Sequence, residues 1–327
     1  MNIADIAKIA GVAKSTVSRY LNGGSIGEAT RKKIESVIKE TGYSPNKFAQ
    51  SLKAKRTNMI GTIVPRLDSY ATSQTLIGID KQLLDMNFQL VISNTSQSLD
   101  REIEYIYSLA KQKVDGIILM ATEITDSHLE AFEAVKIPIM LVGQQHDQYH
   151  SLIHDDFEAS YELGKNVLKK GHRKIAYLGV SEKDIAVGIK RKEGFRKAVS
   201  EQPGCEVAFF ETSFKIEDAI KKVPEIIEEY HPSLIFCATD NIALGALKAA
   251  NMRGLSVPRD LSITGFGGYD ITKITYPGIT TAKFHYKEAG KISAKNMVQL
   301  INGEQLSKIT LSTYKIIERE SVDKLID

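Results

Sequence analysis

The chain has 327 residues, 43% hydrophobic and 25% charged, which is typical of globular proteins and too long for one ordinary core. Its net charge of +3 hides an asymmetry: residues 1–57 carry 11 Lys and Arg against 4 Asp and Glu, and the remainder carries 32 against 36. A basic segment ahead of an acidic remainder favours a polyanion, and nucleic acid in particular, as the partner of residues 1–57.

Several classes of protein are disfavoured by what the sequence lacks. The N-terminus has no signal-peptide pattern, and no run approaches the ~18 apolar residues of a membrane span, so no membrane partner is expected. Cys205 and Cys237 stand far apart, without disulfide-framework or metal-ligand spacing. A reducing cytoplasm is therefore the expected location.

Residues 4–22 contain the first clear motif. Apolar residues at helical spacing, interrupted by Gly11, predict a helix, a tight turn and a second helix from about Lys14 to Leu21. Short polar groups and a bidentate donor on the second helix suit base edges and phosphates in a DNA major groove. The residues that it would present outward are Lys14, Ser15, Ser18 and Arg19.

The rest of the basic segment predicts a third helix and a linker. Asn2 is placed to cap the first helix, and a third helix from about Glu28 to Thr41 completes a small head. Residues 45–57, PNKFAQSLKAKRT, form a helical pattern too short to be stable alone, as suits a hinge. Leu52 among lysines suits a wedge in the DNA minor groove. Packing of Leu52 on the following domain is the alternative.

From Ile60 onward, short apolar runs alternate with amphipathic helical patterns. Continuous Val, Ile and Leu runs of this kind predict parallel strands covered on both faces, hence an α/β doubly wound architecture with two subdomains. A polar break is expected at residues 143–155. The predicted strands are residues 60–64, 88–93, 115–120, 137–142, 174–179, 206–211, 233–238 and 261–266.

With these pieces in order, the sequence resembles the LacI/GalR family of transcriptional regulators. The motifs are IADIAKIAGVAKSTVSRYLNG, PNKFAQSLKAK, GHRKIAYLG, RKEGF, and ATDNIALGALKA followed by GLSVPRDLSITGF. The resemblance implies a helix-turn-helix DNA-binding head, a hinge, and a periplasmic-binding-protein-like effector domain of two doubly wound subdomains. The corresponding boundaries are residues 1–45, 46–58 and 59–327. It also implies a homodimer on a pseudo-palindromic operator.

Residue roles on the DNA side follow from this resemblance. Lys14 and Ser15 occupy the positions that discriminate operators, with Ser18 and Arg19 behind them, and Thr16 matches a phosphate contact. Leu52 matches the leucine inserted at the operator centre, with Ala49 and Lys53 beside it. No leucine-heptad tail follows the last strand-like segment, so a dimer is expected rather than a tetramer.

The expected effector site lies at the carboxyl ends of the strands. Asp240 matches the family's ligand aspartate and Arg191 a ligand arginine; a helix N-cap and a surface ion pair are their respective alternatives. Arg66 suits a phosphate, and its alternative is a surface pair with Asp68. Ser69, Tyr70 and Thr72 are expected to line the same pocket, and Asp155 is a weaker candidate.

The segments PRLDS and CATDNIALGA resemble those of family members that respond to disaccharide phosphates, and DIAVGIKRKEGF and ERESV resemble the sucrose type, which favours sucrose 6-phosphate. Trehalose 6-phosphate, a free sugar and a corepressor-dependent regulator remain alternatives, and a sugar-transport binding protein is the rival class. An enzyme is not expected, because GFGGYD at 265–270 lacks the third glycine of a dinucleotide loop. His146, His150 and His154 are expected to be solvated, so no metal or cofactor is predicted.

Overall fold

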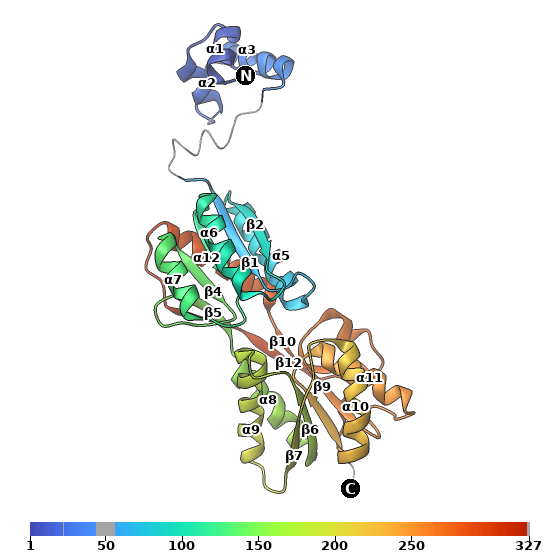
Figure 1. Cartoon of the computed structure of the whole chain (residues 1–327). Coiled ribbons are helices and arrows are strands. Elements are labelled where there is room, and N and C mark those ends of the chain that lie inside the picture. Colours follow the sequence, from blue (N-terminus) through green and yellow to red (C-terminus); the bar gives the residue numbers. More distant parts are fainter. Residues whose placement is uncertain (22, 44–55, 326–327) are drawn as a thin grey trace. The chain divides into compact units, whose positions relative to one another are not determined.

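The computed structural model describes residues 1–21, 23–43 and 56–325. The chain divides into two compact units, residues 1–58 and 59–327 (Figure 1). The first unit contains α1 (Ile3–Ala10), α2 (Lys14–Leu21) and α3 (Glu28–Thr41). The predicted bounds of the second and third helices are therefore confirmed.

One small core holds these three helices together. Its buried members are Ile6, Ala7, Ala10, Val17, Ile34 and Val37, with Val12, Ile38 and Tyr43 half-buried against it. Asn2 caps the start of α1. Its side-chain oxygen accepts from the Ala4 backbone amide at 2.8 Å, and its backbone amide donates to the Asp5 carboxylate at 2.7 Å. Gly11 ends α1 at φ +63°, a conformation that glycine adopts without strain.

The second unit contains two subdomains, each built on one sheet. The strands of the first sheet all pair in parallel, in the order β11-β5-β4-β3-β1-β2. They are β1 (Met59–Val64), β2 (Gln89–Asn94), β3 (Gly116–Leu119), β4 (Ile139–Val142), β5 (His150–His154) and β11 (Ile309–Ser312).

Helices cover both faces of the first sheet. Alternation along β1 sends Ile60 and Val64 to one face and Ile63 to the other. Helices α5 (Tyr70–Asp85) and α12 (Tyr286–Ile301) pack on the first face, and α6 (Leu99–Lys111) and α7 (Asp126–Val135) pack on the second.

The second sheet has the order β12-β10-β9-β8-β6-β7, parallel except for β12. Its strands are β6 (Lys174–Gly179), β7 (Glu206–Glu211), β8 (Leu234–Cys237), β9 (Ser262–Gly267), β10 (Thr280–Phe284) and β12 (Tyr314–Ile317). Its helices are α8 (Asp156–Lys169), the π-helical turn η1 (Ile185–Lys190), α9 (Arg191–Ser200), α10 (Ile216–Tyr230), α11 (Asp240–Met252) and the 3-10 turn η2 (Asp270–Lys273).

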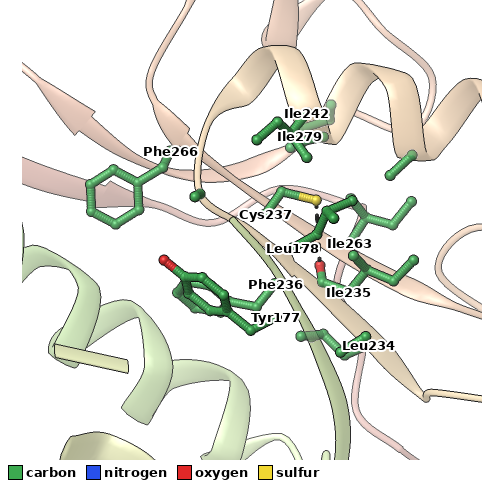
Figure 2. Packing of buried hydrophobic residues seen from close by; sticks show 14 of the residues in the cluster. Tyr177, Leu178, Leu234, Ile235, Phe236, Cys237, Ile242, Ile263, Phe266 and Ile279 are labelled. Carbon is green, nitrogen blue, oxygen red and sulfur yellow. Dashed lines mark hydrogen bonds between the residues drawn. The ribbon is translucent and has the colours of Figure 1, made fainter. Parts of the chain in front are cut away.

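The core of this subdomain is rich in aromatic rings. Phe236 lies 4.3 Å from Phe195 and 5.7 Å from Tyr177 between ring centroids, and Figure 2 shows Tyr177 and Phe236 side by side. Cys237 is buried beside them as a free thiol, and Cys205 is also free.

The chain does not finish one subdomain before it starts the other. After β10 it returns to the first subdomain for α12, which packs on α5 (Figure 1), and for β11, before β12 joins the second sheet. The prediction of parallel strands in two doubly wound subdomains is confirmed. The predicted polar break at residues 143–155 is wrong in part, because β5 lies within it: Ser151 and Leu152 are buried between polar ends.

None of the helices in the described parts of the chain combines the length and the apolar character needed to cross a bilayer.

Candidate functional sites

The exposed surface of α2 carries polar and basic side chains. Lys14, Ser15 and Arg19 are exposed, whereas Val17 lies on the core side, as helical periodicity requires. Thr16 and Ser18 are half-buried. The first turn of α2 has no acidic residue, so its backbone N–H groups and Lys14 together form an electropositive helix start.

Two further features extend this basic surface. A Cβ on Gly24 would lie 2.5 Å from Cγ of Arg19, so the turn after α2 closes directly against the arginine's stem. On α3, Arg31 sits 5.6 Å from the centroid of the Tyr20 ring, and Lys32 and Lys33 are exposed. The predicted hinge contacts Ala49, Leu52 and Lys53 lie outside the described residues.

In the second unit, the loops that follow β1 and β2 surround a cavity of about 410 Å³. The carboxyl ends of neighbouring parallel strands meet at one edge of a sheet, which is where α/β proteins bind ligands. The lining residues are Arg66, Leu67, Asp68, Asn94, Ser96 and Gln97.

Arg66 contacts both a carboxylate and an aromatic ring. Its Nε lies 3.6 Å from Oδ1 of Asp68, and its guanidinium lies 5.5 Å from the ring centroid of Phe214 in the second subdomain. The Arg66 side chain is 27% exposed and that of Asp68 is 82% exposed. The pair with Asp68 therefore exists, but an exposed contact of this length is worth only about 0–1 kcal/mol.

The neighbouring candidates lie outside the residues that line this cavity. Ser69 caps α5, its hydroxyl accepting from the Thr72 amide at 3.4 Å, and Thr72 is buried. Tyr70 reaches the second subdomain instead: its hydroxyl donates to Asp270 at 3.1 Å and its ring lies 4.4 Å from that of Tyr269. Burial and the Asp270 carboxylate raise the pKa of Tyr70.

Asp240 is fully buried at the start of α11. Its carboxylate accepts from the Tyr269 amide at 2.6 Å and from the Thr281 hydroxyl at 2.7 Å. Burial raises its pKa to about 6, although both hydrogen bonds act in the opposite direction. The N-cap alternative for Asp240 is wrong, because Thr239 holds that position and accepts from the Ile242 amide at 3.2 Å.

Arg191 is held by a buried ion pair rather than a surface one. Its Nε donates to Oδ1 of Asp156 at 2.7 Å, and another guanidinium nitrogen donates to the Ala238 carbonyl at 2.7 Å. The guanidinium also lies 4.3 Å from the ring centroid of Phe266. The surface-pair alternative is therefore wrong. Asp155 caps α8 through the Glu158 amide at 3.1 Å.

The prediction that His146, His150 and His154 are solvated is wrong for His154. This residue ends β5 beside the ion pair of Arg191 and Asp156. Burial, the charge of Arg191 and His285 lower the pKa of His154 to about 3, so the ring is neutral. It packs 4.7 Å from Phe284 and 5.1 Å from Tyr286. Over residues 1–21, 23–43 and 56–325, no group of three His, Cys, Asp or Glu side chains is arranged to hold a metal ion.

Sequence reasoning missed four residues of this region: Phe214, Tyr269, Asp270 and Asp156 in its role as the partner of Arg191. The segment 265–270, which lacks the third glycine of a dinucleotide loop, supplies Tyr269 to Asp240 and Asp270 to Tyr70. Tyr269 and Asp270 lie just after the predicted strand at residues 261–266, and this position could have marked them as site candidates.

A helical head with an exposed basic surface, followed by two parallel-sheet subdomains with a cavity at the strand ends, defines a ligand-responsive regulator. The profile of bacterial regulatory proteins of the lacI family matches residues 2–46, and that of the periplasmic binding protein-like domain matches residues 165–322. The sucrose operon repressor of Staphylococcus xylosus is 42% identical over 311 residues, spanning 94% of this chain and 96% of that protein. The chain therefore belongs to the LacI family.

Other relatives and solved structures agree. The transcriptional regulator DegA of Bacillus subtilis (strain 168) is 34% identical, covering 88% of each protein. The lac repressor dimer bound to operator and the anti-inducer ONPF has the same fold, with a TM-score of 0.91 over 99% of each chain at 24% identity. A LacI family regulator from Enterococcus faecium with bound ribose superposes with a TM-score of 0.73 at 26% identity, covering 82% of this chain and all of that one. The protein is thus a LacI-family transcriptional repressor and not an enzyme.

Proposed function

We propose that this repressor controls a sugar-utilisation operon and that its inducer is a phosphorylated disaccharide, with sucrose 6-phosphate favoured. The observation that carries the proposal is Arg66 on the wall of the cavity at the ends of β1 and β2. The identity of 42% to a sucrose operon repressor supports the sugar. The protein is expected to act in the cytoplasm, where its DNA is.

On the DNA side, α2 enters the major groove of an operator half-site. Lys14 and Ser15 read base edges, with Ser18 and Arg19 behind them, and Thr16 binds a phosphate. Two copies of the chain bind the two halves of a pseudo-palindromic operator. In this proposal residues 1–45 form the head, residues 46–58 the hinge with its contacts Ala49, Leu52 and Lys53, and residues 59–327 the effector and dimerisation domain.

On the ligand side, Arg66 binds the phosphate of the inducer. A guanidinium offers parallel N–H donors that match phosphate oxygens, and such charge-assisted hydrogen bonds are the strong ones. The contact that Arg66 makes with Asp68 is long and exposed, so a phosphate can replace it at little cost. Asn94, Ser96 and Gln97 bring amide and hydroxyl groups to the same cavity.

The sugar rings lie between the subdomains, in contact with Asp240 and Arg191. A carboxylate has about four lone-pair sites, and Tyr269, Thr281 and the Gly268 amide use at most three of those of Asp240, so it retains acceptor capacity for a sugar hydroxyl. Both side chains are buried. Ligand entry therefore requires the subdomains to separate.

Three contacts join the subdomains near the cavity and would have to break. Tyr70 donates to Asp270 and stacks on Tyr269, and Arg66 lies over Phe214. Inducer binding shifts the population between two arrangements of the subdomains, and the hinge transmits the change to the heads. The loss of operator affinity then equals the inducer's differential affinity for the two arrangements.

Titration calorimetry on the full chain tests the inducer. Sucrose 6-phosphate, trehalose 6-phosphate, sucrose and trehalose are each titrated into the protein. Binding of sucrose 6-phosphate, with at least about tenfold weaker binding of unphosphorylated sucrose, is the expected result, since a hydrogen bond to a charged group contributes about 1.5–3 kcal/mol. Preference for trehalose 6-phosphate changes the sugar but keeps the role of Arg66. Binding of the free sugars alone refutes the proposed inducer.

A further inference from the structure

A network of buried polar side chains lies behind the cavity, and no role described so far uses it. Thr95, Glu102 and His128 are each fully buried in the first subdomain. Glu102 lies in the first turn of α6, and His128 in the first turn of α7. Side chains from the first turns of two helices thus meet at the Glu102 carboxylate.

Hydrogen bonds connect these side chains in series. The Thr125 amide donates to Nδ1 of His128 at 3.2 Å, so Nε2 is the ring nitrogen that donates to Glu102, at 3.1 Å. The second carboxylate oxygen of Glu102 accepts from the Thr95 hydroxyl at 3.5 Å. That hydroxyl also lies 3.4 Å from the Val64 carbonyl at the end of β1.

Thr95 belongs to the loop that lines the cavity. The Thr95 amide donates to the Val64 carbonyl at 3.0 Å, and the Gln97 amide donates to the Pro65 carbonyl at 3.0 Å, directly before Arg66. Ser96 and Gln97 have φ of +54° and +64°, a left-handed backbone that persists in such residues only when the surroundings enforce it. The buried network of Thr95, Glu102 and His128 supports this loop from the side that faces the protein interior.

The same support extends to the next strands of the sheet. The Gln144 side chain, after β4, donates to the Thr122 carbonyl after β3 at 2.7 Å. Thr122 lies on the same loop as Thr125, the hydrogen-bond partner of His128. Loops after β1, β2, β3 and β4 are therefore tied together at the edge of the sheet that carries the cavity.

We propose that Thr95, Glu102 and His128 are positioning residues for the anion-binding cavity. They fix the strained loop at residues 94–97, so that Asn94, Ser96 and Gln97 converge with Arg66 on the anionic group of the ligand. The assignment of that group as a phosphate rests on the proposed function; the support of the loop does not. The three residues do not touch the ligand themselves.

A matched pair of buried histidines tests this inference. His128→Gln breaks the network, whereas His172→Gln removes a buried histidine that bonds Ser233 and Asp323 ahead of β6, in the other subdomain. Hydrogen exchange of the Thr95, Gln97 and Ser98 amides is measured in the unliganded full chain, together with sucrose 6-phosphate binding. Exchange about tenfold faster and binding about tenfold weaker are expected for His128→Gln alone, although both variants lower the melting temperature.

A gentler pair keeps the test decisive if His128→Gln fails to fold. Thr95→Val keeps the shape of the side chain without its hydroxyl, and Thr95→Ser keeps the hydroxyl. Faster exchange at residues 95–98 in Thr95→Val and its recovery in Thr95→Ser support the inference. Unchanged exchange in Thr95→Val and His128→Gln overturns it. Altered exchange in these variants, together with no phosphosugar binding by the unaltered chain, overturns the proposed inducer and leaves the support of the loop established.

Discussion

Replacing Asp240 by Asn should change the pH dependence of stability in a predictable direction. Burial raises the pKa of this carboxyl from 3.8 to about 6. The folded state therefore binds more protons than the unfolded state between about pH 4 and 6. Under that condition the free energy of unfolding falls as the pH rises, so ionised Asp240 destabilises the unliganded fold at neutral pH.

The size of this effect follows from the two pKa values. Integrating the difference in proton binding from about pH 4.5 to pH 7 gives a loss of about 2 kcal/mol for the unaltered chain. The Asp240→Asn variant has no such loss. The amide oxygen that it introduces can accept from the Tyr269 amide, and the new NH₂ group can donate to the Thr281 hydroxyl, which is free to rotate toward the Ala282 carbonyl 3.5 Å away.

Urea unfolding followed by circular dichroism, at several pH values without sugar or DNA, measures this difference. The stability of Asp240→Asn relative to the unaltered chain should rise by about 2 kcal/mol from about pH 4.5 to 7. Asp85→Asn, which removes an exposed carboxyl, serves as the control and should show no comparable trend. A stability difference for Asp240→Asn that does not vary with pH would refute the raised pKa. A poor induction response is also expected, because one acceptor for sugar hydroxyls is weakened.

Arg66→Gln should weaken phosphosugar binding by about 10- to 100-fold in calorimetry, because it loses charge-assisted hydrogen bonds, whereas Arg259→Gln on the exposed surface should have no effect. If Arg66→Gln binds the phosphosugar as tightly as the unaltered chain, Arg66 has only a surface role. Leu52→Ala should weaken operator binding about tenfold or more in a gel-shift titration, because burying a leucine contributes about 1.5–3 kcal/mol, and it should leave sugar binding unchanged. An unchanged operator affinity would refute the insertion of Leu52 into the minor groove. Arg191→Met should cost about 3–5 kcal/mol in urea unfolding, because Asp156 is left buried without its cation, and the added change Asp156→Leu should restore much of it. Additive losses in that double variant would contradict the buried pair.

Local patterns in the sequence were sufficient for the head and for most strands. Asn2, Gly11 and the helical spacing define α1 and α2 within one short segment, and the continuous apolar runs define the buried strands. β5 was missed because its ends are His150 and His154, so the pattern is polar although the strand is paired on both sides. The return of α12 and β11 to the first subdomain depends on tertiary packing, which the local spacing of apolar residues in the sequence does not reveal.

The candidate site was predicted less completely than the fold. Arg66 and Asp240 were chosen as candidates because they follow predicted strands, whose carboxyl ends share one edge of a sheet, and Arg191 was chosen from its motif. Which of two adjacent aspartates pairs with Arg191 depends on the phase of α8, and Asp156 rather than Asp155 faces inward. The contact of Tyr70 with Asp270 spans 200 residues of sequence and becomes visible only when the subdomains are folded.

The most direct test of the whole account is operator affinity of the full chain with and without sucrose 6-phosphate, measured in parallel for the unaltered protein and Arg66→Gln. We expect the phosphosugar to weaken specific DNA binding of the unaltered protein by at least about fivefold, the lower range of allosteric coupling, and to leave that of Arg66→Gln unchanged. Operator affinity that stays constant in the unaltered protein at saturating sucrose 6-phosphate would contradict the account.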